Sequence, residues 1–307
     1  MSSRLVIFLT SSGTLTYNNG FQITREGALN IVRQAVAAGI THASYVGTIG
    51  AVLDLASPLV KAPLSDKDWN PLTEESVLSS GNPVLVYTVA KTQAEQSLWK
   101  FADEHPELNL TTGTFWGLID YSSEMVPLTD VLVSPSSFIG PYTEEFIITP
   151  GNVSDLSTSV MVYNFLGGPE ASLNTLPIGH VDVRDVAAAM VAGIKVKGNH
   201  RLLLTGEWFD YADVVKHIAA TRPELAPRLI KTTSAGQNRP MIDSKKALDV
   251  LGITLTPWKK TIDDGLDSVL KLEKDWAEKG VDLAPLKNNG WIEFVKSGAN
   301  TRVEFTG

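Results

Sequence analysis

The alternation of short apolar runs with longer amphipathic stretches is the feature that most limits how this chain can fold. Leu5 to Leu9 is a β-branched-rich apolar run that ends at Ser11-Ser12-Gly13, as a strand buried on both faces does. From Thr24 to Gly39 the apolar residues follow helical spacing, and Thr41 to Val46 then has the composition of a second strand. Strands that alternate with helices predict a parallel α/β sheet.

The same alternation continues along the chain. Residues 60–83 predict a polar loop with at most one short helical turn, and Tyr87 to His105 predicts an amphipathic helix. We place a third strand within residues 130–141 and a further strand at residues 201–206. After Gly206 the sequence becomes helical and irregular, which indicates a smaller appended lobe.

Composition excludes several classes of protein. The chain carries 26 Lys and Arg against 34 Asp and Glu, with no basic stripe that could neutralise phosphates, so we expect no nucleic-acid partner. It contains no cysteine, and the apolar run near the N-terminus is too short for a membrane span. We therefore expect a cytoplasmic protein without membrane contact. His42 and His180 stand singly and without metal-ligand spacing, so we expect no metal site.

A tyrosine and a lysine stand four residues apart in "YTVAK", as Tyr87 and Lys91. Residues at this spacing share one face of a helix, so the lysine ammonium can lie beside the phenol and favour its ionised form. Such a phenol could give or take a proton near neutral pH. The bare pattern is weak, because many helices contain a packing tyrosine and a solvated lysine at this spacing.

The neighbouring motifs make the pattern specific. "GTIGAVLD", "DWNPLTEE", "VYTVAKTQAEQSLWKFADEHPELNLTT", "SFIGPY" and "HVDVRDVAAAMVAGI" follow one another in this order. Together they resemble the extended short-chain dehydrogenases/reductases, and within them the fungal carbonyl reductases related to dihydroflavonol reductases. The resemblance runs from about residue 4 to about residue 275. It implies a catalytic set of Tyr87, Lys91 and Thr48, in which the threonine hydroxyl donates a hydrogen bond to a carbonyl oxygen.

The family's nucleotide fingerprint, G-x-x-G-x-x-G between the first strand and the first helix, does not occur in the sequence. Leu5 to Leu9 aligns best with the family's fourth strand, so we expect a truncated Rossmann-like parallel sheet that lacks the first mononucleotide half. A competing alignment makes this run the first strand and places the deletion after it. Both alignments leave no phosphate loop, and we therefore expect no bound cofactor.

Two domains follow from this alignment. We expect a truncated Rossmann-like domain at residues 1–206, with an insertion at residues 113–130, and a mainly helical substrate-binding lobe at residues 207–307. The insertion is either a wall of the substrate pocket or a tolerated surface loop. The residues that we expect to contact the substrate are Phe115, Trp116, Tyr121, Ser136 and Phe138.

A truncated sheet would expose the edge of a buried strand. We expect residues 11–23 or a second copy of the chain to cover it. The family's common dimer, built from the helices at Ala28 to Val36 and Tyr87 to Phe101, remains available, so we expect a homodimer.

Three functions compete. The first is a cofactor-independent isomerase, dehydratase or cyclase that acts on a small carbonyl compound, a secondary metabolite, through Tyr87, Lys91 and Thr48. The second is an NADPH-dependent ketone or aldehyde reductase, which the retained catalytic set favours and the missing phosphate loop opposes. The third is a non-catalytic binding protein derived from a reductase. We rank them in this order.

Overall fold

The computed structural model describes part of the chain, and the statements below concern that part. The described residues are 3–7, 20–53, 63–80, 82–115, 138–143, 145, 148–152, 155–156, 159–169, 178–232 and 242–283. The chain forms two compact units, which we describe separately. The first unit contains residues 1–119, 184–205 and 239–255, and the second contains residues 120–183, 206–238 and 256–307.

A four-stranded parallel sheet forms the centre of the first unit. Its strands are β1 (Ser3–Ile7), β2 (Ile40–Thr48), β3 (Asn109–Phe115) and β7 (His200–Leu204). They lie in the order β1-β2-β3-β7, and each pairs with its neighbour in parallel. The predicted α/β fold with a parallel sheet is therefore confirmed. The prediction that the sheet is truncated stays a prediction.

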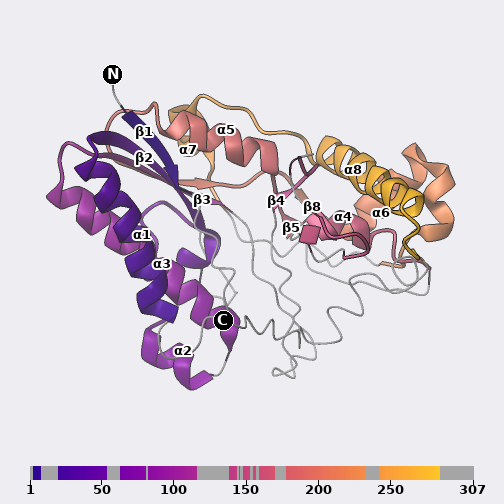
Figure 1. Cartoon of the computed structure of the whole chain (residues 1–307), viewed down its shortest axis with the longest axis horizontal. Coiled ribbons are helices and arrows are strands. Elements are labelled where there is room, and N and C mark those ends of the chain that lie inside the picture. Colours follow the sequence, from indigo (N-terminus) through magenta and orange to yellow (C-terminus); the bar gives the residue numbers. More distant parts are fainter. Residues whose placement is uncertain are drawn as a thin grey trace. The chain divides into compact units, whose positions relative to one another are not determined.

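Helices cover both faces of this sheet. On one face α1 (Gly20–Ala37) and α3 (Pro83–Glu104) lie side by side (Figure 1). Side chains alternate along β2, so Ala43 and Tyr45 join the apolar cluster under these two helices. The residue between them points the other way: the Ser44 hydroxyl donates to the sulfur of Met190, which belongs to α5 (Val183–Gly193) on the opposite face.

Local sequence signals explain where these helices begin and end. α3 begins at Pro83, where a missing N–H costs nothing. The preceding Asn82 accepts hydrogen bonds from the first turn, through its side chain from Leu85 and through its carbonyl from Val86. After α1 the chain turns at Gly39, whose φ of 79° suits glycine at a helix C-terminus.

Two expectations about the first unit need correction. The segment before α3 contains α2 (Glu74–Ser80), a seven-residue helix where we expected at most one short turn. The third strand of the sheet is β3, at residues 109–115, whereas we placed it within residues 130–141. β3 is rich in threonine rather than in large apolar residues, so the apolar pattern did not predict it. The remaining helix of this unit, α7 (Lys245–Leu251), lies against β7.

Two short strand pairs belong to the second unit. β4 (Phe138–Ile139) pairs in parallel with β6 (Val181–Asp182), and β5 (Ile178–Gly179) pairs antiparallel with β8 (Trp208–Phe209). The helices of this unit are α4 (Val160–Asn164), α6 (Tyr211–Thr221), η3 (Pro223–Arg228) and α8 (Trp258–Glu278).

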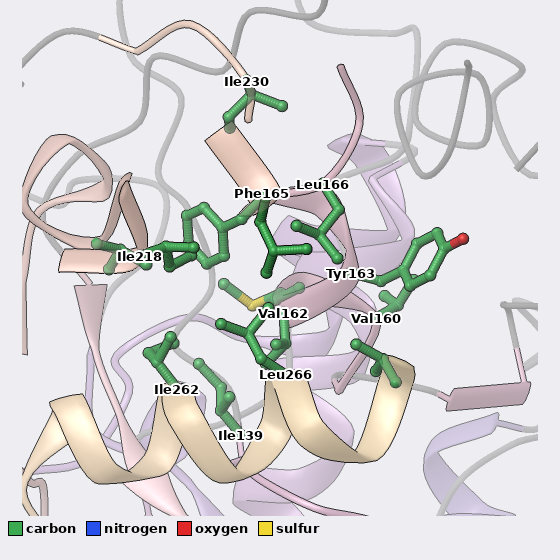
Figure 2. Packing of buried hydrophobic residues seen from close by; sticks show 14 of the residues in the cluster. Ile139, Val160, Val162, Tyr163, Phe165, Leu166, Ile218, Ile230, Ile262 and Leu266 are labelled. Carbon is green, nitrogen blue, oxygen red and sulfur yellow. The ribbon is translucent and has the colours of Figure 1, made fainter. Parts of the chain in front are cut away.

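An apolar core joins the helices of the second unit. Figure 2 shows Ile262 and Leu266 of α8 beside Val162 of α4. The two helices can come close because α8 has Gly265 at the contact: a Cβ there would lie 3.0 Å from a methyl carbon of Val162. The role of residues 207–307 as a substrate-binding lobe stays a prediction.

Two glycines of the first unit should respond oppositely to alanine. A Cβ at Gly193 would lie 2.7 Å from the Ser44 hydroxyl and 3.1 Å from a carbon of Thr111, so Gly193→Ala should lower the free energy of unfolding by about 1–3 kcal/mol. Gly27 lies exposed in α1 with nothing within 4 Å of its Cβ position, so Gly27→Ala should raise it by up to about 1 kcal/mol. Urea denaturation measures both, and equal effects would contradict this packing.

Candidate functional site

Thr48 and Tyr87 meet at the carboxyl end of β2. Thr48 is the last residue of the strand and is 2% exposed. Its hydroxyl oxygen accepts a hydrogen bond from the N–H of Gly50, 3.3 Å away, and so caps the short helix η1 (Ile49–Ala51). A hydrogen bond also links the Thr48 hydroxyl to the phenol of Tyr87, which lies near the start of α3. The structure therefore brings these two predicted site residues into contact.

Asn70 holds the turn that follows Thr48. Its side-chain amide donates to the carbonyl of Gly50 at 2.7 Å, and its backbone N–H donates to the carbonyl of Ala51 at 2.9 Å. Its side-chain oxygen accepts from the N–H of Leu72 at 2.9 Å. Because Asn70 is 5% exposed, these bonds are shielded from water and hold η1 against the segment at residues 70–72.

Lys91 follows Tyr87 by one turn of α3 and lies inside the unit. Its side chain is 4% exposed, and its ammonium nitrogen lies 5.1 Å from the centre of the Tyr45 ring. Burial removes the Lys91 ammonium from water and lowers the pKa of Lys91 to about 8. The nearby carboxylate of Glu95 opposes this shift. Near pH 8, therefore, a small change of surroundings moves Lys91 between its charged and neutral forms.

The Tyr87 phenol differs from our expectation. We expected the lysine to lower its pKa, but burial raises the pKa of Tyr87 to about 12, and the hydrogen bond with Thr48 only partly offsets this. Desolvation of the phenolate is the larger effect, and the lysine does not make the phenol acidic. At neutral pH, Tyr87 is consequently a neutral phenol with a proton to give.

A buried carboxylate behind this pair was missed at the sequence level. Glu95 is fully buried, and one of its oxygens accepts from the Thr112 hydroxyl at 2.8 Å and from Nε of Arg201 at 3.0 Å. The available signal was the spacing, since Tyr87, Lys91 and Glu95 recur every four residues along α3. Tyr45 was missed as well, although its phenol lies near both Tyr87 and Glu95.

Arg201 connects this carboxylate to the segment before α2. Its guanidinium stacks on the Trp69 ring at 3.5 Å from the ring centre, and it donates to the carbonyls of Asp66 and Asp68 at 2.9 and 2.5 Å. The "DWNPL" stretch therefore has a structural explanation: Trp69 covers the buried ion pair.

The predicted substrate contacts are mostly untested. Phe115 is the last residue of β3, and Phe138 begins β4 in the second unit. Trp116, Tyr121 and Ser136 lie outside the described residues, as does most of the segment 113–130. Within the described part of the chain, no three His, Asp or Glu side chains gather in a way that could hold a metal ion. Nor does that part contain a helix long and apolar enough to cross a membrane.

Known proteins resemble this chain. No protein-family model matches it. A protein of Candida albicans named "Putative NADPH-dependent methylglyoxal reductase GRP2" is 27% identical over 264 residues, which make up 82% of this chain and 67% of that protein. The solved structure of Gre2 from Candida albicans in complex with NADPH has a TM-score of 0.70 at 20% identity. The structure of yeast methylglyoxal/isovaleraldehyde reductase Gre2 complexed with NADPH has a TM-score of 0.68 at 23% identity, and each alignment covers 88% of this chain and 77% of the other.

These comparisons correct two expectations. The cofactor-independent isomerase, dehydratase or cyclase is wrong, because the sequence relative is named as an NADPH-dependent reductase. The expectation that no cofactor binds is wrong for the same reason, and both solved structures contain NADPH. The chain spans about two thirds of the length of this Candida albicans protein. Its resemblance to the extended short-chain dehydrogenases/reductases, and to the fungal carbonyl reductases among them, is confirmed.

Proposed function

We propose that this chain is an NADPH-dependent reductase of small aldehydes or ketones. The observation that carries the proposal is the group at the end of β2, where the phenol of half-buried Tyr87 is hydrogen-bonded to the buried Thr48 hydroxyl, and buried Lys91 follows one helical turn later. The name of its Candida albicans relative supports the same class of reaction.

Each member of the group has a role in the reduction. NADPH, when bound, supplies a hydride to the carbonyl carbon of the substrate. The Thr48 hydroxyl, whose oxygen accepts from the N–H of Gly50, would donate a hydrogen bond to the carbonyl oxygen of the bound substrate. Tyr87 transfers its phenolic proton to that oxygen as the C=O bond becomes a C–O single bond. The product is an alcohol, and the phenolate left on Tyr87 is stabilised by the Lys91 ammonium.

The direction of the Tyr87 pKa agrees with reduction. A phenol with a pKa of about 12 is protonated at neutral pH and can donate, whereas oxidation of an alcohol would need the phenolate at the start. The developing alkoxide is a much stronger base than a carbonyl oxygen, so it draws the proton even from this weakened acid.

The chain fits the nicotinamide end of NADPH better than its phosphate end. Tyr87, Lys91 and Thr48 supply the proton and the hydrogen bond that hydride transfer to a carbonyl needs. The sequence contains no G-x-x-G-x-x-G, and the described strands run β1-β2-β3-β7 without the reversal of order at which doubly wound sheets bind dinucleotides. We propose that the pyrophosphate is held in another way, by this chain or by a partner chain.

Further expectations belong to this proposal. Phe115, Trp116, Tyr121, Ser136 and Phe138 remain the predicted substrate contacts, and a homodimer and a cytoplasmic location remain predictions. Exposed Ile23 and Ile31 on α1 are compatible with a contact between copies, since they are 58% and 37% exposed.

Removal of the Tyr87 hydroxyl should separate chemistry from binding. The wild-type protein should bind NADPH in a calorimetric titration and oxidise it in the presence of a small ketoaldehyde such as methylglyoxal. Tyr87→Phe should lower kcat by about 10²–10⁴-fold and leave NADPH binding unchanged. Tyr142→Phe is the matched control, because that phenol donates to the carbonyl of Ser268 in the second unit. A wild-type protein without NADPH binding, or an active Tyr87→Phe variant, would refute the proposal.

The rate should also depend on the charge of Lys91. Its pKa of about 8 means that the ammonium is present below pH 8 and is lost as the pH rises through 8, so kcat should fall there. The Tyr87 proton is retained well beyond this range, so it does not cause the fall. Steady-state kinetics between about pH 6 and pH 10 measure the profile. Lys91→Met should be slower at pH 7 and lack the fall, and a flat wild-type profile would contradict this role.

A further inference from the structure

Glu95 is a buried charge that the proposed reaction does not use. It is fully buried on α3, one turn beyond Lys91. A carboxylate out of contact with water is costly unless charged partners and hydrogen bonds surround it. One of its oxygens has such partners in Thr112 and Arg201.

The second oxygen of Glu95 has none among the described residues. It faces the space beside Gly47, the residue before Thr48: a Cβ on this glycine would lie 3.4 Å from that oxygen and 3.2 Å from the Thr114 hydroxyl. The buried Thr114 hydroxyl has no hydrogen-bond partner in the described structure either. Arg201 therefore binds only one of the two oxygens of Glu95. The other oxygen lies near Gly47, next to the catalytic Thr48 in the sequence.

The charged and titratable groups near Lys91 can be named for the elements of the first unit that the structure describes. On α3 itself they are Tyr87 and Glu95, and on β2 the group is Tyr45, whose ring lies under the ammonium. β3 and η1 contribute no titratable side chain at this contact. The charged residues that α1 and α2 carry are not buried: Arg25, Glu26, Arg33, Glu74 and Glu75. Of these groups, Glu95 is the buried carboxylate, and it lies one turn from Lys91 on α3.

We propose that Glu95 is a positioning residue that acts on proton transfer through Lys91, as the buried carboxylate that keeps the lysine ammonium charged one helical turn from Tyr87. The inference deepens the proposed reductase function and rests on it.

The positive charge of Arg201 weakens the effect of Glu95 on the pKa of Lys91. Arg201 and Lys91 together carry two positive charges against one on Glu95, so the buried group has an excess positive charge while Lys91 is protonated. An oxyanion at the substrate or at Tyr87 would be attracted by this excess. If Arg201 were neutral, Glu95 would hold the lysine proton more firmly and the excess would vanish.

A direct titration of Lys91 tests the proposal without any substrate. In protein labelled with ¹³C at the lysine Cε, the Lys91 signal is identified by its loss in Lys91→Met and followed against pH. Its midpoint, about 8 in the wild type, should fall by about one pH unit or more in Glu95→Gln. Glu74→Gln is the matched control, because this carboxylate, which accepts from Gln93 of α3, is exposed and should leave the midpoint unchanged.

The opposite change provides a second, independent arm. Arg201→Gln keeps an N–H donor near Glu95 but removes the competing charge, so the Lys91 midpoint should rise. Circular dichroism establishes that each variant is folded. If Glu95→Gln does not fold, the Arg201→Gln result decides. An unchanged midpoint in folded Glu95→Gln, or a midpoint that does not rise in folded Arg201→Gln, would overturn the proposal.

Kinetics then connect the titration to the reaction. In Glu95→Gln the fall of kcat at alkaline pH should move to lower pH by the same amount as the Lys91 midpoint, with little change in KM, which a merely structural role would not produce. If the wild type reduces no carbonyl compound, the reductase proposal fails. The titration still decides on the coupling between Glu95 and Lys91.

Discussion

The ion pair between Glu95 and Arg201 is the interaction on which the rest of the first unit's site depends. It joins the middle of α3 to β7, the far strand of the sheet, across a side chain of β3. A helix lying on a sheet can in general slide and rotate by small amounts, since apolar contacts have no preferred direction. The buried, charged hydrogen bond between Arg201 and Glu95, 3.0 Å long, does have a preferred direction. It fixes the rotation of α3, so that the residues one and two turns earlier, Lys91 and Tyr87, lie against the end of β2.

Desolvation and charge then act against each other at this site. Burial makes the phenol of Tyr87 a weaker acid and the ammonium of Lys91 a stronger one, so it favours the neutral form of both groups. The neighbouring carboxylate restores part of the lysine's charge, and Thr48 restores part of the acidity of the phenol. In the proposed reaction, the charge that develops on the substrate oxygen then draws the proton from Tyr87.

Local patterns in the sequence were enough to predict the α/β fold, the first two strands and the long helix that carries Tyr87 and Lys91. They failed at β3, because the strand "NLTTGTF" fills buried positions with threonines. The hydroxyls of Thr111 and Thr112 find their partners, the Gly193 carbonyl and Glu95, only in the folded unit. The partner of Glu95 lies 106 residues away in the sequence, so no local pattern could predict the pair. The cofactor was predicted wrongly for a different reason: we took the missing glycine fingerprint as a statement about the reaction, although it concerns only one way of holding phosphates.

The segment from Asp66 to Asn70 has a consequence for how such a chain can change over evolutionary time. Segments between helices and strands usually accept insertions and deletions, because few contacts depend on their length. Here Asn70 is bound to the turn after Thr48, and Trp69 and the carbonyls of Asp66 and Asp68 hold Arg201. A gain or loss of one residue would prevent Trp69 from stacking on Arg201 while Asn70 binds the turn after Thr48. This stretch should consequently drift by substitution at its exposed positions while its length stays constant, as the length of a core strand does.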